Sequence, residues 1–378
     1  MGVQEKSKKI SAASARAHTR KSTSNSSLPF PFSLGLSSKI LVVVIVVCLT
    51  WADRAFRPPP PKVCGTPGGP PVTAPRIKLR DGRYLAYKEY GVPKDEAKHH
   101  FIFIHGFDSC RLHAFIATEV SPDTIESLGL HIVGFDKPGY GESTPDPNRT
   151  PKSLALDVEE LADQLGFGPK FYVVGYSMGG EAVWGLLKYI PHRLAGASLV
   201  TPVVNYWWSS LPANLTKEAY YLQLPQDQWS LRVSHYLPWL TYWWQTQKWF
   251  APSSVIAHSS EVLSRQDREV MFKFVKPENM IPVRQQGVHE SIHRDMIVGF
   301  GKWEFDPIQL ENPFPNNEGM VHLWQGDEDM LVPVIMQRYI AQELPWIHYH
   351  EVSGSGHMFP YVEGMSDAIV KAQLSVEN

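Results

Sequence analysis

Short apolar runs alternate with helical segments along most of the chain. The runs are rich in aromatic and β-branched residues, as buried strands are, and they fall at 101–104, 131–135, 171–174, 195–200, 320–324 and 346–352. Segments with helical periodicity lie between them, for example 153–165 and 180–187. Two earlier strands, 76–79 and 84–89, flank an Asp81-Gly82 turn and predict a hairpin. The pattern predicts an α/β fold with a mostly parallel central sheet, whose ligand site lies at the carboxyl ends of the strands.

The alternation breaks between 203 and 306, after the sixth parallel-type strand. Seven of the twelve tryptophans lie within 207–249 of this stretch, and a helix is predicted over 231–250 with a break near Pro238. We interpret it as a helical cap inserted between two parts of the core, 73–202 and 307–378. Its tryptophans suit an aromatic lid over the site, an anchor at a membrane interface, or the small core of the cap itself.

The first 72 residues differ in character from the rest. Residues 1–39 hold seven Lys or Arg, ten Ser and a single acid, Glu5, which predicts a disordered basic tail. The thirteen uncharged residues 40–52 predict an uncleaved signal anchor, with the tail cytosolic and the domain on the lumenal or outer side of a secretory membrane. A cleaved signal peptide and a chloroplast transit peptide are the alternatives. Residues 53–72 are rich in Pro and Gly and predict a stiff linker.

Composition narrows the class of protein. With 378 residues, of which 43% are hydrophobic, the chain can form one α/β domain with an insertion. A net charge of −2 provides no field for binding nucleic acid. Cys48, Cys64 and Cys110 are too scattered for a disulfide framework or a C-x-x-C site. Neither a cofactor nor a metal ion is therefore expected.

The run Gly175-Tyr176-Ser177-Met178-Gly179 carries the clearest chemistry. It lies between the strand at 171–174 and the helix at 180–187, so Ser177 is expected on a sharp turn from strand to helix. Free amide groups at the start of that helix would face an oxyanion formed at the serine. This context predicts a serine nucleophile.

Four further loops follow predicted strands in a consistent order. Downstream, Gly326-Asp327-Glu328-Asp329 follows the strand at 320–324, and Gly354-Ser355-Gly356-His357 follows the strand at 346–352. Upstream, His105-Gly106-Phe107 follows the strand at 101–104, and the run 136–143 follows the strand at 131–135. A histidine can take the proton of a serine hydroxyl, and a buried carboxylate can fix the histidine tautomer.

With these motifs the chain resembles the α/β-hydrolase superfamily, and most closely its cap-bearing serine esterases, including plant members. The resemblance covers 72 to the C-terminus. It implies Ser177 as nucleophile, His357 as general base and Asp329 as the acid that orients the imidazole, with the backbone amides of Phe107 and Met178 as the oxyanion hole. Because the family places the acid three residues after the glycine, Asp329 is preferred, and Asp327 stays open.

These features predict a serine hydrolase that cleaves carboxylic esters of apolar or amphipathic small molecules or lipids through an acyl-enzyme. Thioester cleavage and acyl transfer are related options. The alternative from another class is a ligand-binding, receptor-like protein that keeps the triad but turns over little.

A second motif favours different chemistry. His289-Glu290-Ser291-Ile292-His293 matches H-E-x-x-H, which on a helix places two histidines toward a zinc ion, as in metallopeptidases. The Pro- and Asn-rich stretch 307–317 does not suit the second helix of such enzymes. We therefore interpret 288–300 as a helix that joins the cap to the core.

Overall fold

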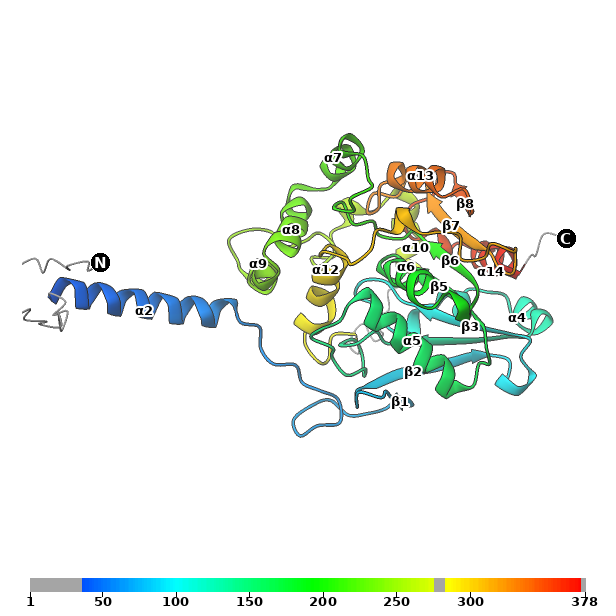
Figure 1. Ribbon diagram of the computed structural model, residues 1–378, viewed down its shortest axis with the longest axis horizontal. Helices are drawn as coiled ribbons and strands as arrows, with labels where there is room; N and C mark the ends of the chain where they lie inside the picture. The colour runs from blue at the N-terminus through cyan, green and yellow to red at the C-terminus, as the bar shows by residue number, and fades with distance from the viewer. Residues whose placement is uncertain (1–35, 275–282, 375–378) are drawn as a thin grey trace, which may run out of the picture. The chain divides into compact units, whose positions relative to one another are not determined.

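A computed structural model describes residues 36–274 and 283–374 of the chain (Figure 1). By its internal contacts the chain divides into two units, residues 1–53 and 54–378. Most of the predicted basic tail, residues 1–35, lies outside the described residues.

The described part of the first unit belongs to helix α2 (Leu36–Phe56). Its apolar residues are exposed, and charged residues bound the apolar run at Lys39 and at Asp53. No helix in 36–274 or 283–374 combines the length and the apolar character needed to cross a membrane. The signal anchor predicted over 40–52 therefore gains no support from the structure.

The second unit is built on one eight-stranded sheet, with strand order β1-β2-β4-β3-β5-β6-β7-β8. The first two strands form the predicted hairpin and pair antiparallel, and all pairings from β4 to β8 are parallel. The strands are β1 (Arg76–Lys78), β2 (Tyr84–Gly91), β3 (His99–Ile104), β4 (Leu130–Phe135), β5 (Phe171–Tyr176), β6 (Leu194–Val200), β7 (Val321–Gly326) and β8 (Ile347–Val352). The predicted α/β fold with a mostly parallel sheet is confirmed.

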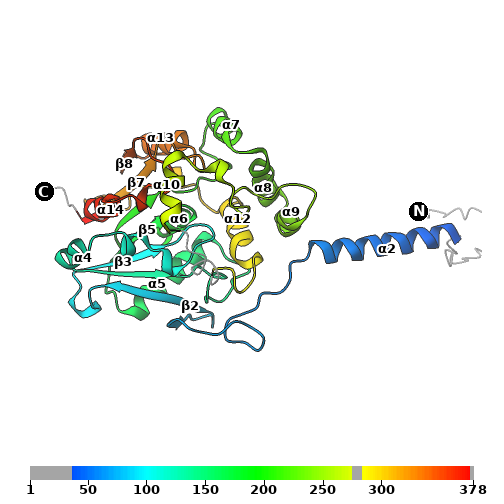
Figure 2. The same ribbon diagram turned by 180° about the vertical axis from the view of Figure 1, so that it is seen from behind.

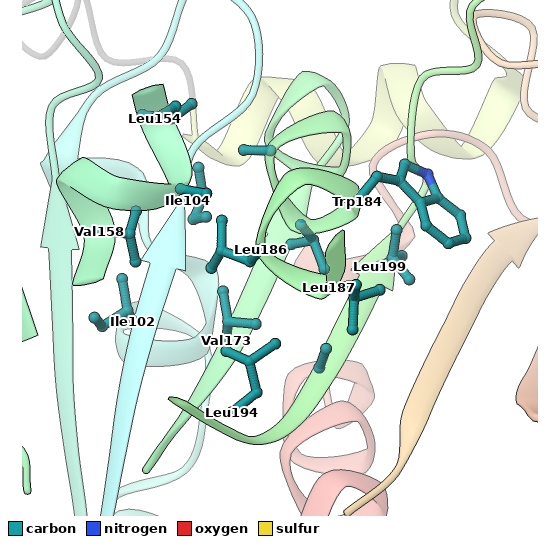
Figure 3. Close-up of a cluster of buried hydrophobic side chains, with 14 of the residues drawn as sticks. Ile102, Ile104, Leu154, Val158, Val173, Trp184, Leu186, Leu187, Leu194 and Leu199 are labelled. Carbon is teal, nitrogen blue, oxygen red and sulfur yellow. The ribbon is translucent and has the colours of Figure 1, made fainter. Parts of the chain in front are cut away.

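Helices cover both faces of this sheet. Helices α5 (Pro151–Leu165), α6 (Met178–Tyr189) and α13 (Val334–Glu343) pack on one face, where side chains such as Ile102, Val173 and Trp184 are buried together (Figure 3). Helices α3 (Phe115–Thr118), α4 (Pro122–Leu128) and α14 (Met365–Leu374) pack on the other face. Each fully buried side chain of this size contributes about 1.5–3 kcal/mol, so the two layers hold the sheet rigid beneath its loops.

Helix α5 has recognisable capping residues at both of its ends. Thr150 accepts a hydrogen bond from the Ser153 amide while the Ser153 hydroxyl accepts one from the Thr150 amide, which forms a capping box, and Pro151 occupies the first turn. Gly166, with φ of 71°, ends the helix in the left-handed conformation.

The stretch 203–306 is mainly helical, with α7 (Ala213–Leu222), α8 (Pro225–Tyr236), α9 (Thr241–Thr246), α10 (Arg265–Phe274) and α12 (Arg294–Gly299). Figures 1 and 2 show α7, α8, α9 and α12 gathered on one side of the core. The helix predicted over 231–250 is broken as expected, by a 3-10 turn at Pro238–Leu240, but it ends at Thr246. Residues 275–282, which fall inside the predicted cap, lie outside the described residues.

Candidate active site

Ser177 occupies the turn between β5 and α6, as the motif predicts. Its φ of 54° and ψ of −120° are unusual for a residue with a side chain and cost about 1–3 kcal/mol. Backbone hydrogen bonds hold the turn in place, since the Ser177 amide donates to the Val200 carbonyl at 2.9 Å and the Gly180 amide donates to the Ser177 carbonyl at 2.9 Å. The turn thus projects Ser177 from the end of a central strand.

Close packing explains the glycines on either side of this turn. A Cβ on Gly179 would lie 2.0 Å from the carbonyl oxygen of Ile104, and a Cβ on Gly175 would lie 2.4 Å from the carbonyl oxygen of Gly179. Neither backbone atom can move away without disrupting β3 or α6. The G-x-S-x-G spacing is therefore a packing requirement where α6 crosses β3 and β5.

His357 and Asp329 meet in the loops that follow two neighbouring parallel strands, β8 and β7. The His357 Nδ1 lies 2.8 Å from the Asp329 Oδ2, which also accepts a hydrogen bond from Gln325 Nε2 at 2.9 Å. The other carboxylate oxygen accepts from the amides of Leu331 and Val332, each at 2.9 Å. The carboxylate thus takes part in four hydrogen bonds, which fix its orientation toward the His357 ring.

Asp327, the alternative acid, is directed elsewhere. Its carboxylate accepts from the Ser353 hydroxyl at 3.1 Å and from the Ser355 amide at 3.3 Å. The structure thus brings Asp329, and not Asp327, to the imidazole of His357.

Two residues of helix α10 hold the histidine loop on either side of His357. Gln266 Oε1 accepts from the Gly356 amide at 2.8 Å, and Asp267 Oδ1 accepts from the Met358 amide at 2.7 Å. The sequence analysis missed both residues. The spacing Ser264-x-x-Asp267 marks a capping box at the start of α10 and could have predicted where that helix begins, but not what it contacts.

The surroundings of His357 raise its pKa above the ordinary value. Burial alone would lower the pKa, but the charge of Asp329 and its hydrogen bond, together with the charge of Asp267, outweigh the burial. These carboxylates therefore favour the imidazolium, the form that a general base reaches when it has taken a proton.

Ser177 and His357 line the same cavity. In the described part of the chain no hydrogen bond joins the Ser177 hydroxyl to the His357 ring, although the two side chains lie in one wall. Such bonds commonly tighten only when a substrate is bound. The His357 carbonyl accepts from the Tyr176 hydroxyl at 3.2 Å, which ties the histidine loop to the residue before the serine.

The loop that contains Phe107 is fixed next to Ser177. The Lys137 amide donates to His105 Nε2 at 3.0 Å, so the other ring nitrogen of His105 is the one that donates to the Gly106 carbonyl, at 2.8 Å. Burial lowers the pKa of His105 well below its ordinary value and keeps the ring neutral. A Cβ on Gly106 would lie 3.0 Å from the Ser177 Cβ, which shows how closely this loop approaches the serine.

The predicted oxyanion amides both belong to residues of the cavity wall, Phe107 and Met178. Met178 is the first residue of α6, so its amide has no acceptor within the helix. These positions allow two amide donors near the serine.

The cavity has a volume of about 260 Å³ and is lined by residues of the core and of the stretch 203–306. Its wall is mostly apolar, with side chains such as Val204, Leu231, Met296, Phe300 and Val332. Apart from Ser177 and His357, its polar residues are few and are described below.

None of the seven tryptophans at 207–249 lines this cavity. Trp208 is buried in the core cluster, whereas Trp229, Trp239 and Trp249 are exposed to 53%, 61% and 71%. The interpretation of the tryptophans as an aromatic lid over Ser177 is therefore wrong, because their indole rings pack into the core, within the cap or on its outside. Tyr206 supplies an aromatic side chain to the wall instead.

The run 136–143 does not line the cavity but ties the core together. Asp136 is fully buried and accepts from the Arg111 side chain and amide, and the Lys137 ammonium donates to Asp295 of α12 at 2.6 Å. Asp295 also accepts from the Tyr140 hydroxyl at 2.7 Å. This ion network joins the loop after β4 to the stretch 203–306.

The H-E-x-x-H motif does not lie on a regular α-helix. His289–His293 is a single π-helical turn before α12, and the Glu290 carboxylate pairs with Arg294 at 2.7 Å. Within 36–274 and 283–374 no group of three His, Cys, Asp or Glu side chains is placed to hold a metal ion. The predicted helix over 288–300 is correct in position, but its first turn is π-helical.

Comparisons with known proteins agree with this geometry. A model of the alpha/beta hydrolase family matches residues 101–372. No curated protein matches the chain significantly.

Solved structures share the fold at low sequence identity. A thermophilic esterase from Thermogutta terrifontis is 18% identical, with 81% of this chain and 100% of that chain covered and a TM-score of 0.51. An esterase from Exiguobacterium antarcticum is 15% identical, with 80% and 100% covered and a TM-score of 0.50. A bromoperoxidase from Bacillus anthracis is 17% identical, with 80% and 100% covered and a TM-score of 0.51.

Proposed function

This chain belongs to the alpha/beta hydrolase family, and from that premise we propose that it is a serine hydrolase that cleaves carboxylic esters through an acyl-enzyme. One observation carries the proposal. Ser177, on a strained turn, shares a cavity with His357, whose ring is held by the fully hydrogen-bonded carboxylate of Asp329. This arrangement of nucleophile, base and orienting acid defines the serine-hydrolase triad.

In the first half of the reaction, His357 Nε2 takes the proton of the Ser177 hydroxyl while the oxygen attacks the ester carbonyl carbon. The carbonyl oxygen becomes an oxyanion that accepts hydrogen bonds from the amides of Phe107 and Met178. The bond to the alcohol oxygen then breaks, and the imidazolium returns its proton to the leaving alcohol. Asp329 stabilises the imidazolium and keeps the tautomer with the proton on Nδ1.

In the second half, a water molecule loses a proton to His357 and attacks the acyl carbon on Ser177. The acid is released, and the proton returns to the serine oxygen. Both halves use the same groups, so no cofactor is required.

The cavity supports an apolar or amphipathic substrate. Its wall is mostly aliphatic and aromatic, and its volume of about 260 Å³ suits a medium-sized acyl or alcohol group rather than a polymer. Thioesters and acyl acceptors other than water fit the same chemistry.

Counting turnovers tests the proposal against the receptor-like alternative. We expect p-nitrophenyl esters of short and medium chain length to yield many product molecules per protein, and Ser177→Ala to abolish this. Ser210→Ala, a serine outside the cavity wall, is the matched control and should keep full activity. Product that stops at or below one equivalent would overturn the esterase proposal in favour of a ligand-binding protein.

Attachment to a membrane through the N-terminal segment stays a prediction, as does a secretory or chloroplast location. Cell fractionation followed by carbonate extraction would test both. Release of the full chain into the soluble fraction would contradict membrane attachment.

A further inference from the structure

A small polar cluster interrupts the apolar wall of the cavity. It is formed by Gln223 at the end of α7, Asp227 in the first turn of α8, and Ser253 and Ser254 after α9. The Asp227 Oδ1 accepts from the Ser253 hydroxyl at 2.7 Å and from the Ser254 amide at 2.8 Å. These two hydrogen bonds fix the Asp227 carboxylate in one orientation.

Three atoms of this cluster lack hydrogen-bond partners although they are buried. They are the Asp227 Oδ2, the Gln223 Nε2 and the Ser254 hydroxyl. Asp227 is only 6% exposed, and its described hydrogen-bond partners within residues 36–274 and 283–374 are Ser253 and Ser254 rather than a cation. The nearby Arg232 lies over the rings of Tyr220 and Trp229 instead.

A buried carboxylate oxygen without a donor is unfavourable, and such groups in native proteins normally have a partner. All three residues line the cavity, so a molecule bound there is a candidate partner once these side chains turn toward it. The cluster lies at the cap side of the same cavity whose other wall holds Ser177 and His357. A molecule held at the cluster and a molecule that reacts at Ser177 can therefore be one substrate.

The polar atoms without hydrogen-bond partners indicate which functional group that substrate carries. The Asp227 Oδ2 requires a donor, whereas the Gln223 Nε2 requires an acceptor. A hydroxyl group supplies both, an ammonium group can only donate, and a carboxylate can only accept and would be repelled by Asp227. We propose that the substrate carries a hydroxyl group that donates to Asp227 and accepts from Gln223.

This inference rests on the proposed function, because the hydroxyl belongs to the ester cleaved at Ser177. The class of substrate is then a hydroxylated ester with an otherwise apolar chain. Such a molecule places its reactive carbonyl at Ser177 and its single polar group at the cap.

Three esters with a six-carbon chain test the inference on the full chain. They are p-nitrophenyl hexanoate, 6-hydroxyhexanoate and 6-aminohexanoate, with the uncatalysed reaction subtracted. We expect kcat/KM to be about ten-fold or more higher for the hydroxyl ester than for the hexanoate. Asp227→Asn should reduce this ratio by about ten- to a hundred-fold, the loss typical of a hydrogen bond to a charged group.

Asp306→Asn is the matched control. Asp306 is buried and likewise accepts from a serine hydroxyl and the next serine amide, those of Ser209 and Ser210, but it does not line the cavity. It should leave the ratio unchanged. If Asp227→Asn does not fold, Gln223→Met removes the donor of the same contact and should also reduce the ratio.

Two results would overturn the inference. One is equal kcat/KM for the hydroxyl ester and the hexanoate, or a ratio that Asp227→Asn leaves unchanged, which would assign the cluster to bound water. The other is preference for the 6-aminohexanoate, which would assign it to a cation.

A binding measurement separates this inference from the proposed function. Calorimetry on Ser177→Ala compares hexane-1,6-diol with hexan-1-ol. Tighter binding of the diol that depends on Asp227, with no ester hydrolysed by the parent protein, would uphold the hydroxyl site and overturn the esterase. Equal binding of the two alcohols, with Ser177-dependent hydrolysis intact, would overturn the hydroxyl site alone.

Discussion

Replacing Asp329 by Asn should disable the site while leaving its shape intact. The side-chain oxygen of the new residue can still accept from the amides of Leu331 and Val332, which are fixed in the backbone. The amide nitrogen then faces Gln325 and His357. Because that nitrogen donates, His357 must turn its proton to Nε2, which then cannot take the proton of Ser177.

The magnitude follows from the lost charge and the wrong tautomer. The carboxylate is in hydrogen-bond contact with the ring, and two unit charges about 4 Å apart interact by about 4 kcal/mol at an effective dielectric constant of about 20. Loss of that interaction with the imidazolium slows the reaction about a thousand-fold. The wrong tautomer adds to this, and the expected total is a loss of about 10⁴ in kcat, the value known for removal of an orienting aspartate.

The assay is kcat for p-nitrophenyl butyrate hydrolysis, with thermal unfolding to show that the variants fold. Asp327→Asn is the matched control, because its carboxylate hydrogen-bonds to Ser353 and Ser355 rather than to His357, and it should keep activity within about three-fold. Equal losses in the two variants, or more than about a tenth of the activity left in Asp329→Asn, would refute the reasoning.

Three further predictions follow from the same geometry. The neutral form of His357 accepts the serine proton and the pKa of His357 is raised, so kcat/KM should fall as pH drops through that raised pKa. Asp267→Asn removes one of the charges that raise this pKa and should move the acidic limb of the pH profile to lower pH. An unmoved acidic limb would exclude Asp267 as a positioning residue. Gly179→Ala should lower the free energy of unfolding by about 2 kcal/mol or more in denaturant titrations, because its Cβ would lie 2.0 Å from the carbonyl oxygen of Ile104; an unchanged midpoint would contradict this close approach. A chelator, and separately Glu290→Gln, should leave at least half of the ester hydrolysis, since Glu290 is held by an ion pair to Arg294 rather than acting as a base; loss of activity in both would point to a metal-dependent enzyme.

Local patterns were sufficient to predict the sheet and the serine turn. Strands β3, β4, β5 and β7 are short apolar runs and are largely buried, as those runs indicate. Strand β8, which precedes the loop of His357, is more polar and buries only Ile347. The turn at Ser177 could be predicted because the strand before it, the helix after it and the flanking Gly175 and Gly179 are all adjacent in the sequence. The order of residues along the chain was therefore enough to predict most of the sheet and the turn at Ser177.

The choice between Asp327 and Asp329 as the triad acid required the three-dimensional structure. Asp327 and Asp329 lie in the same loop, and the residues themselves do not distinguish them. Which carboxylate meets His357 depends on how the loop after β7 turns, and Leu331 and Val332 fix that turn through their amides.

Contacts made by the stretch 203–306 could not be predicted. Gln266 and Asp267 hold the loop of His357 about ninety residues away, and no periodicity encodes such a pairing. The prediction that the tryptophans form a lid was wrong for a related reason. A bulky apolar residue is equally suited to the cap core, the cap surface and a lid, and only packing decides between them.

Labelling with a fluorophosphonate probe is the most direct test of an activated serine at position 177. The full chain is compared with Ser177→Ala and His357→Ala, and circular dichroism shows that each protein is folded. The account predicts that the parent protein is labelled and that both substitutions abolish labelling. A folded parent protein that the probe does not label, or labelling that persists in Ser177→Ala, would contradict it.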